Sequence, residues 1–388
     1  MKTIYLDNNA TTAVAPEVRD AMLPYFNEAY GNPSSLYDLG YSAKDAVAKA
    51  RQQVADLLNC EPDEIIFTSC GTESDNAAIM GTLWAHPDKK HFITTKVEHH
   101  AVGYVGESLE KKGYTVTWLQ VNINGMLDLD EFKKALRPDT GIVSVMWANN
   151  ETGVIFPVEE MARICKEKGI IFHTDAVQAA GKINLDMKHS AIDMLSISGH
   201  KLHAPKGIGI LYQRNGLIWE PLTKGGQQEK GKRPGTENVP YIVGMGVAAQ
   251  LAKTALDEEV KYLANLRDYL ESEILKRIPD ARITGGNSPR LPNTCHICFK
   301  DAKDDAMLHL LNTFGICASS GSACNTESPE ISHVLRAMKI PDEYAFGSLR
   351  LSLSRYSTRE DVDYLLELLP TVVERTRKAR KRRQQTVR

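Results

Sequence analysis

Short apolar runs recur along the first half of the chain, and each ends in a cluster of polar residues. The runs cover residues 65–68, 91–95, 141–147, 170–174 and 194–197. Their apolar residues are nearly continuous, which is typical of strands buried on both faces of a parallel sheet. Between them, apolar residues recur at helical spacing over 42–58, 77–84 and 158–168. This alternation predicts an α/β fold with a mostly parallel sheet between layers of helices.

The rest of the chain predicts a second, smaller α/β domain. A Gly-rich loop at 224–240 precedes a helical pattern over 241–277, which we expect to be broken once. Strands are expected near 281–284, 294–299, 315–318 and 348–353, and helices near 304–312, 330–338 and 359–379. We therefore predict a large domain at 16–255 and a small domain formed by 1–15 and 256–388.

Composition narrows the class of protein. The chain has 388 residues, of which 42% are hydrophobic, so it can bury a large core. A net charge of -2 favours neither nucleic acid nor a membrane surface as partner, and we expect no signal peptide and no membrane-spanning segment. Seven scattered cysteines predict reduced thiols and a cytoplasmic location. The basic tail at 375–388 is expected to be a solvated helix end.

Polar residues that could carry chemistry follow the predicted strands. They are Thr72, His99, Asn150, Asp175 and Lys201. Because the carboxyl ends of parallel strands meet at one edge of a sheet, we expect these side chains to converge there.

Lys201 follows the strand at 194–197 in a turn rich in Gly and Pro. Most lysines are solvated surface charges, but an amine at this edge, with its pKa lowered by burial and by His200, could form a Schiff base. Ser198 and His200 could hold a phosphate beside it. A lysine Schiff base next to a phosphate site suggests pyridoxal phosphate.

Two further junctions suit such a cofactor. Gly71 and Thr72 stand where a strand enters a helix, a place that binds anions, although an ordinary helix capped by Thr72 or Ser74 is equally consistent. No dinucleotide or ATP motif is present in the sequence. Asp175 could protonate a pyridine nitrogen, or be a plain turn residue.

The His99–His100 pair lacks a third metal ligand at suitable spacing, so an imidazole that stacks on a flat cofactor is favoured over a metal site. Arg350 lies in an apolar strand, where it needs an anionic partner.

The cysteines differ in their surroundings. Cys295 and Cys298 fit a strand whose residues alternate in direction, rather than a zinc or redox site. Cys324 stands in the segment 318–329, which has no large apolar side chain to anchor it. We expect a mobile loop, at about 319–332, that carries a lone thiol.

Together these residues resemble the cysteine desulfurases, which are fold-type I pyridoxal phosphate enzymes related to class-V aminotransferases. The resemblance runs nearly end to end, through 6–12, 31–35, 71–76, 98–99, 149–153, 173–178, 198–201, 233–236 and 319–324. The Ser-Gly-Ser-Ala-Cys loop at 320–324 is similar to that of the nitrogen-fixation and iron–sulfur-assembly group. Cys70 departs from the glycine found in many members, beside an intact phosphate motif.

The resemblance implies roles for these residues. Lys201 would carry the cofactor, Asp175 would pair with the ring nitrogen, Gln178 with the ring hydroxyl, and His99 would stack on the ring and help to move protons. The phosphate would be held by Gly71, Thr72, Ser198, His200 and, from the other subunit of a homodimer, Thr236.

On the substrate side, the resemblance implies that Arg350 grips the carboxylate of L-cysteine, with Asn150 and Asn32 beside it. Cys324 would take the sulfur as a persulfide, alanine would leave, and an iron–sulfur scaffold or another acceptor would receive the sulfur. No resident metal is expected, although the persulfide could briefly bridge a nascent cluster. Alternatives are a selenocysteine lyase, another pyridoxal phosphate lyase or aminotransferase that would not need Cys324, and a non-enzymatic sulfur carrier that would tolerate loss of Lys201.

Overall fold

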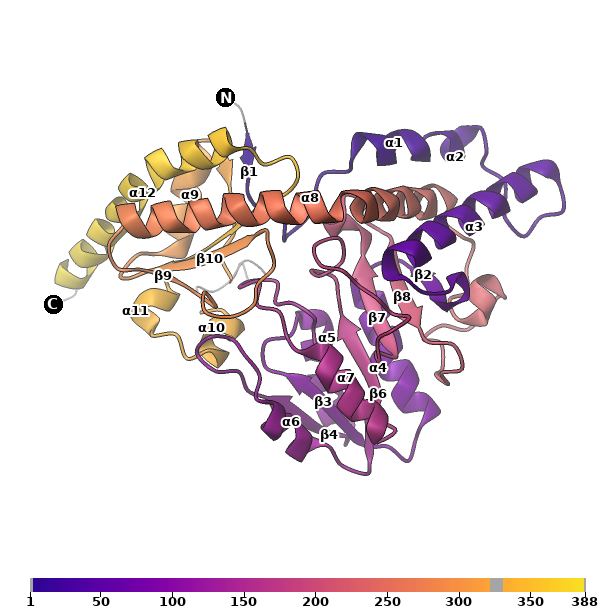
Figure 1. Cartoon of the computed structure of the whole chain (residues 1–388). Helices are drawn as coiled ribbons and strands as arrows, with labels where there is room; N and C mark the ends of the chain where they lie inside the picture. The colour runs from indigo at the N-terminus through magenta and orange to yellow at the C-terminus, as the bar shows by residue number, and fades with distance from the viewer. Residues whose placement is uncertain (1–2, 322–330, 387–388) are drawn as a thin grey trace.

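The computed structural model describes residues 3–321 and 331–386, with side chains up to residue 379. Within this part of the chain a seven-stranded sheet forms the centre of the larger body (Figure 1). Its strands, in spatial order, are β2 (Ile65–Thr68), β8 (Gly209–Gln213), β7 (Met194–Ser198), β6 (Ile171–Asp175), β5 (Thr140–Ser144), β3 (His91–Thr95) and β4 (Thr115–Leu119). Only β8 runs antiparallel to its neighbours, so the prediction of a mostly parallel sheet is confirmed.

Helices cover both faces of this sheet (Figure 1). They are α1 (Pro16–Met22), α2 (Pro24–Asn27), α3 (Asp38–Leu58), α4 (Gly71–Ala85), α5 (His100–Lys111), α6 (Leu129–Ala135) and α7 (Val158–Glu167). Short 3-10 turns occur at Pro62–Glu64, Gly199–Lys201 and Gln228–Gly231. The predicted strand at 141–147 ends at Ser144, but the chain continues beside β6, because Trp147 N donates to Asp175 O at 2.8 Å.

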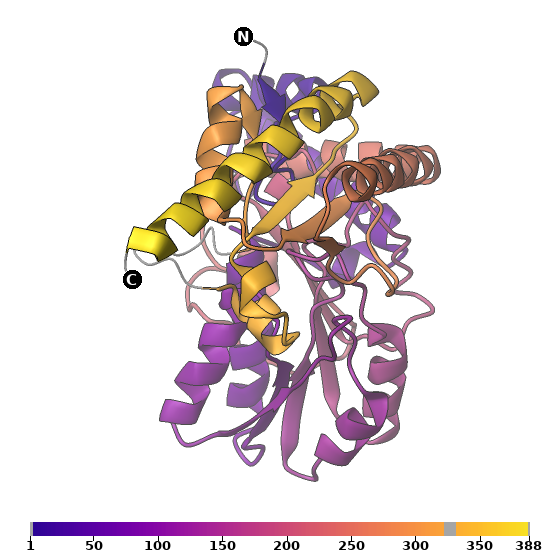
Figure 2. The ribbon, with the colours of Figure 1, turned by 90° about the vertical axis from the view of Figure 1, so that its left-hand side faces the viewer.

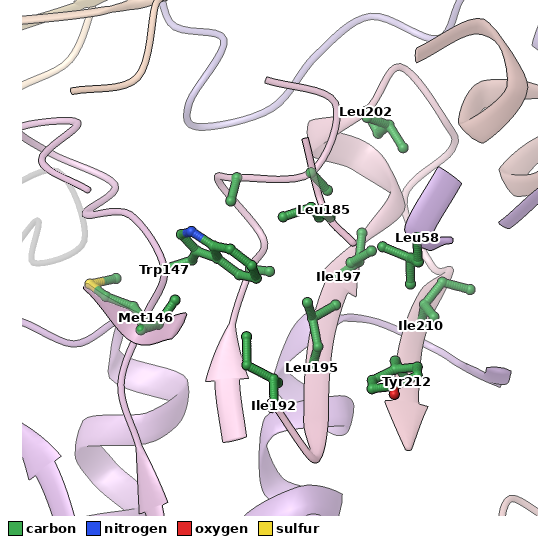
Figure 3. Close-up of a cluster of buried hydrophobic side chains, with 14 of the residues drawn as sticks. Leu58, Met146, Trp147, Leu185, Ile192, Leu195, Ile197, Leu202, Ile210 and Tyr212 are labelled. Atoms are coloured by element: carbon green, nitrogen blue, oxygen red, sulfur yellow. The ribbon is translucent and has the colours of Figure 1, made fainter. Parts of the chain in front are cut away.

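A cluster of buried apolar side chains holds the central strands in place (Figure 3). Leu195 and Ile197 of β7 lie between Trp147 on one side and Leu58 and Ile210 on the other. Burying one such side chain contributes about 1.5–3 kcal/mol, so this packing keeps the end of β7 in a defined place. The residues that follow β7 are therefore held in a defined place as well.

The second body has its own sheets and core (Figure 2). Its strands are β1 (Ile4–Tyr5), β9 (Ala281–Ile283), β10 (Thr294–Phe299), β11 (Ile316–Cys317) and β12 (Ser348–Ser352). They form an antiparallel β12-β10-β9 sheet and a parallel β1-β11 pair. Its helices are α9 (Asp304–Thr313) and α12 (Arg359–Thr386), while the buried residues of α10 (His333–Ala337) and α11 (Asp342–Ala345) pack into the core of the larger body.

Helix α8 (Val239–Arg277) runs through both bodies without a break, so the predicted interruption is wrong (Figure 1). It contributes to the first core as far as Ala252 and to the second from Leu263 onward. By length and composition it could also cross a membrane, contrary to the sequence expectation, but half of its most apolar window is buried inside the protein. That burial is typical of a core helix. A domain boundary near residue 255 stays a prediction.

Candidate active site

The N-terminal segment joins the ends of three central strands. Lys201 Nζ donates to Asn9 O and Ala10 O, both at 2.6 Å, and Gln178 Nε2 donates to Asn9 O at 3.0 Å. Asn9 Nδ2 donates in turn to Asn150 O at 3.2 Å. The residues after β5, β6 and β7 therefore meet at one edge of the sheet, as predicted. The sequence analysis assigned no role to Asn9 by itself, because only the fold brings it here.

Lys201 has an unusually weakly basic amine. Burial first, and then the positive charges of Arg350 and Lys182, lower its pKa from 10.5 to about 8. The prediction that His200 causes part of this shift is wrong, because His200 is a neutral imidazole whose own pKa burial and Lys201 lower to about 4. Lys201 therefore exists partly as the free amine near neutral pH.

Asp175 stands at the end of β6, 5% exposed, with Oδ1 accepting from Val177 N at 2.9 Å. Burial raises its pKa to about 6, although the Val177 N–H and Lys201 oppose this rise. Asp75, buried in the first turns of α4, has its pKa raised well above the usual range by burial and by the charge of Asp175. Of this coupled pair, Asp75 keeps the proton and Asp175 carries the charge.

His173, on β6, lies fully buried beside these carboxyl groups. Its Nδ1 meets Ser144 Oγ at 2.8 Å and its Nε2 meets Ser196 Oγ at 2.9 Å. Burial lowers its pKa to about 3, so the ring is neutral and does not cancel the charge of Asp175. The nearest ionic partner left to Asp175 is Lys201.

The start of α4 is open to an anion. Cys70 is its N-cap residue, and neither Thr72 nor Ser74 caps the helix with its side chain, contrary to the capped alternative. Gly71 lies so close to Ser198 that an added Cβ would stand 3.3 Å from the Ser198 Cβ. Unpaired N–H groups and the helix dipole favour a negative ligand at such an end.

Arg350 reaches the same edge from β12. Its Nη2 donates to Asp7 Oδ1 at 2.9 Å, which confirms the predicted anionic partner, and its Nη1 donates to Asn150 O at 3.1 Å. Its buried Nε has no hydrogen-bond partner among the described residues. Glu151 lies nearby, and burial raises its pKa to about 7, although its bond from Ser332 Oγ at 2.6 Å opposes this rise.

His99 presents its ring to the open side of the site. The ring is exposed, and its Nδ1 accepts from Ala101 N at 3.1 Å. The pKa of His99 is lowered to about 4, mainly because the surrounding protein atoms remove the ring from water, and further by the charge of Lys201. The imidazole is therefore neutral and offers a flat face. Among the described residues, no group of three or more His, Cys, Asp or Glu is placed to hold a metal ion.

Other predicted site residues are not joined to this edge. Thr236 and Asn32 are both exposed, and Asn32 Oδ1 accepts from Ser34 N at 2.9 Å in its own loop. Cys324 lies outside the described residues. Cys295 and Cys298 are fully buried and belong to different cores, which confirms that they alternate in direction along β10.

Pyridoxal phosphate fits the residues present. Within the part of the chain that the structure describes, Gln178 Oε1 and Arg350 Nε are buried without partners, which indicates that a polar ligand is missing at this edge. A free amine, a buried carboxylate and an uncapped helix start match the aldehyde, ring nitrogen and phosphate of the cofactor. The sequence analysis did not assign Asp7, Asp75, Glu151 or Lys182 to the site, and only burial in the folded chain identifies them.

Comparisons with known proteins agree with this chemistry. Residues 4–365 match the family Aminotransferase class-V. The chain is 55% identical to the cysteine desulfurase of Trichormus azollae and 53% identical to cysteine desulfurase NifS of Azotobacter vinelandii, in each case over 97% of this chain and 94% of the relative. A solved NifS-like protein superposes with a TM-score of 0.90 at 39% identity, covering 96% of this chain and 100% of the other.

Proposed function

This chain belongs to the class-V aminotransferase family and, within it, to the cysteine desulfurases, and on that premise we propose which residues carry the reaction. The reaction removes sulfur from L-cysteine and leaves alanine, with Cys324 as sulfur acceptor. The observation that carries the proposal is the buried Lys201 amine, bonded to Asn9 O and Ala10 O at the sheet edge where Asp175 ends β6, with a pKa lowered to about 8. A different lyase or an aminotransferase is not favoured by the comparisons.

The family depends on pyridoxal phosphate, which when bound withdraws electrons from the Cα of an amino acid. We propose that Lys201 holds it covalently, that Asp175 keeps its ring nitrogen protonated, and that Gln178 meets the ring hydroxyl. His99 offers a neutral face for stacking, and it can take up a proton at Nε2, since its Nδ1 is engaged with Ala101 N.

The phosphate would bind at the start of α4 to Gly71 and Thr72, with Ser198 and His200 opposite. His200 is held by Thr11, whose Oγ1 lies 3.1 Å from its Nδ1. Because His200 is neutral, one ring nitrogen can donate to an anion. The helix start and this donor would together stabilise the negative charge of the phosphate.

Arg350 would bind the substrate carboxylate. A guanidinium has five N–H donors, and the two nitrogens bonded to Asp7 and Asn150 leave others free, including the buried Nε–H. Asn150, whose backbone oxygen accepts from Arg350, would lie beside the substrate. Asn32, exposed in a loop that is not joined to this edge, would have to reach the substrate from there. Once released from the cofactor, the Lys201 amine would accept the Cα proton.

We propose a homodimer in which Thr236 serves the other subunit. Its loop is held firmly on its own subunit: Arg51 pairs with Glu229 at 2.8 and 2.6 Å, and Arg233 pairs with Glu73 at 3.0 Å. Thr236 itself points to solvent, where a second copy could meet it. A cytoplasmic location, and an iron–sulfur scaffold or other protein as sulfur acceptor, are part of the same proposal.

The direct test of function is product analysis. The cofactor-loaded protein, given L-cysteine and a thiol reductant, should form alanine and sulfide in equal amounts. L-Serine, which lacks the sulfur that Cys324 would attack, should give neither product. Release of pyruvate and ammonia in place of alanine would identify a lyase of another kind.

Replacing Asp175 by asparagine should retain the cofactor but impair turnover. Without the carboxylate the pKa of the ring nitrogen should fall by about one to three units, so the protonated fraction should fall by up to about 10- to 1000-fold. Alanine formation should fall accordingly, while Asp88→Asn, an exposed turn residue, should leave it unchanged. Near-normal turnover by Asp175→Asn would remove Asp175 from this role.

Replacing Arg350 by alanine should weaken binding of L-cysteine far more than binding of the cofactor. Loss of a buried charged contact costs about 2–5 kcal/mol, or roughly 30-fold or more in substrate affinity. Arg350→Lys keeps the charge but loses the two-pronged contact, so it should fall between wild type and Arg350→Ala. Spectroscopic titrations would give both affinities, and equal losses in the two would indicate a purely structural arginine.

A further inference from the structure

A small polar cavity lies behind Lys201, where the two cores meet. Its volume is about 20 Å³, and its lining includes Lys201, Lys182, His203, Glu259 and Arg355. This space is enough for one water molecule. Charged residues from both bodies therefore line one small space together with Lys201, the residue proposed to take up the substrate proton.

The backbone conformation of the residue before Lys182 directs Lys182 to this cavity. The preceding Gly181 has a φ of +71°, and a side chain there would collide with Leu202, the neighbour of Lys201. Glycine alone allows this close approach. Lys182 Nζ then donates to Gln178 O at 3.1 Å, a carbonyl and not a carboxylate, and among the residues that the structure describes no acid is hydrogen-bonded to it.

Glu259, on the far side of the cavity, favours the charged form of Lys182. Glu259 stands on α8 between the last residue of the first core and the first residue of the second, and Arg355 Nη2 pairs with its Oε2 at 2.8 Å. Burial lowers the pKa of Lys182 to about 8, and the negative charge of Glu259 opposes this shift. His203 Nδ1 donates to Ala13 O at 2.9 Å, and the ring is neutral, since burial lowers its pKa to about 4.

Several other titratable or charged groups, from different elements of the fold, surround Lys201 and affect its pKa. Asp7 and Asp175 favour its charged form, and Arg350 opposes it. His99 and His200 are neutral. Arg350 is itself bonded to Asp7 at 2.9 Å, which offsets much of its charge. Of the two positive groups that lower the pKa of Lys201, Arg350 is bonded to a carboxylate, whereas Lys182 has none bonded to it within residues 3–321 and 331–379.

We propose that Lys182 is a positioning residue for the reaction: its ammonium, held at the shared cavity, favours the uncharged form of the Lys201 amine, which can accept a proton. This inference rests on the proposed role of Lys201. The proposed role of Lys182, in the turn after β6, depends on its positive charge, so an uncharged side chain of equal length could not perform it.

The test is the pH dependence of Lys201 labelling in the cofactor-free full chain. Formaldehyde with a mild borohydride methylates only free amines, and mass spectrometry of the Lys201 peptide gives the midpoint, expected near pH 8 in wild type. In Lys182→Met the midpoint should rise by about one unit, so labelling at pH 7 should slow about tenfold. Lys182→Arg, and the exposed control Lys188→Met, should keep the wild-type midpoint. If Lys182→Met does not fold, Lys182→Gln replaces it.

In the cofactor-loaded enzyme, the pKa that defines the acidic limb of the kcat–pH profile should be higher in Lys182→Met than in wild type. KM should be unchanged. An unshifted labelling midpoint in the folded variant would overturn the proposal, and an equal shift in Lys182→Arg would assign the effect to packing and not to charge. A labelling shift without a kcat shift would instead place the fault in the proposed role of Lys201, because labelling does not depend on turnover.

Discussion

Lys201→Ala is expected to abolish alanine formation from L-cysteine while leaving the fold intact. In the structure the Lys201 amine contacts two backbone oxygens, those of Asn9 and Ala10, so its loss removes little packing. It does remove the proposed covalent anchor and the proposed proton acceptor together. Loss of a general base alone typically costs about 10²- to 10⁴-fold, and we expect a loss at or beyond the upper end.

The measurement pairs turnover with covalent retention of the cofactor. Wild-type protein reduced with borohydride and then denatured should keep the cofactor bound to the peptide that contains residue 201, whereas Lys201→Ala should release it. Lys206→Ala, an exposed lysine five residues further on, is the matched control and should behave as wild type. Covalent retention by Lys201→Ala would show that another lysine is the anchor.

Cys324→Ser should bind cofactor and L-cysteine but release almost no sulfide. A serine hydroxyl is a far weaker nucleophile toward sulfur than a thiolate. Removing a covalent nucleophile usually costs roughly a thousandfold or more, so we expect a loss of at least that size in turnover. The spectral change on adding L-cysteine should persist, because Lys201, Asp175 and Arg350 are untouched.

A thiol-alkylating label should locate the sulfur. After treatment with L-cysteine, the wild-type peptide containing Cys324 should carry one additional sulfur atom, and the peptides with Cys70, Cys295, Cys298 and Cys317 should carry none. Burial raises the pKa of Cys298 to about 12, which leaves its thiol un-ionised at neutral pH. Cys317→Ser, seven residues earlier and half-buried, is the control and should retain full activity. Persulfide on another cysteine, or full turnover by Cys324→Ser, would defeat the assignment.

Much of this protein follows from local patterns in its sequence. Continuous apolar runs such as Ile65–Thr68 predict buried parallel strands, because strands covered on both faces need no polar side. The helix at Val158–Glu167 follows from its spacing in the same way. Lys201 and Asp175 could be singled out because both stand just past such strands. The break predicted within 241–277 was wrong because two cores cover successive stretches of one continuous helix, α8.

The electrostatics of the site depend on tertiary structure alone. The bond from Lys201 to Asn9 spans 192 residues, and that from Arg350 to Asp7 spans 343, so no local pattern contains either pair. From the sequence, His200 was expected to lower the pKa of Lys201 together with burial. In the structure the pKa is lowered by burial, Arg350 and Lys182. A pKa depends on which charges the folded chain removes from water and brings together. Sequence spacing therefore determined which groups reach the edge of the sheet, and only the packing of the two cores decided which of them carry charge there.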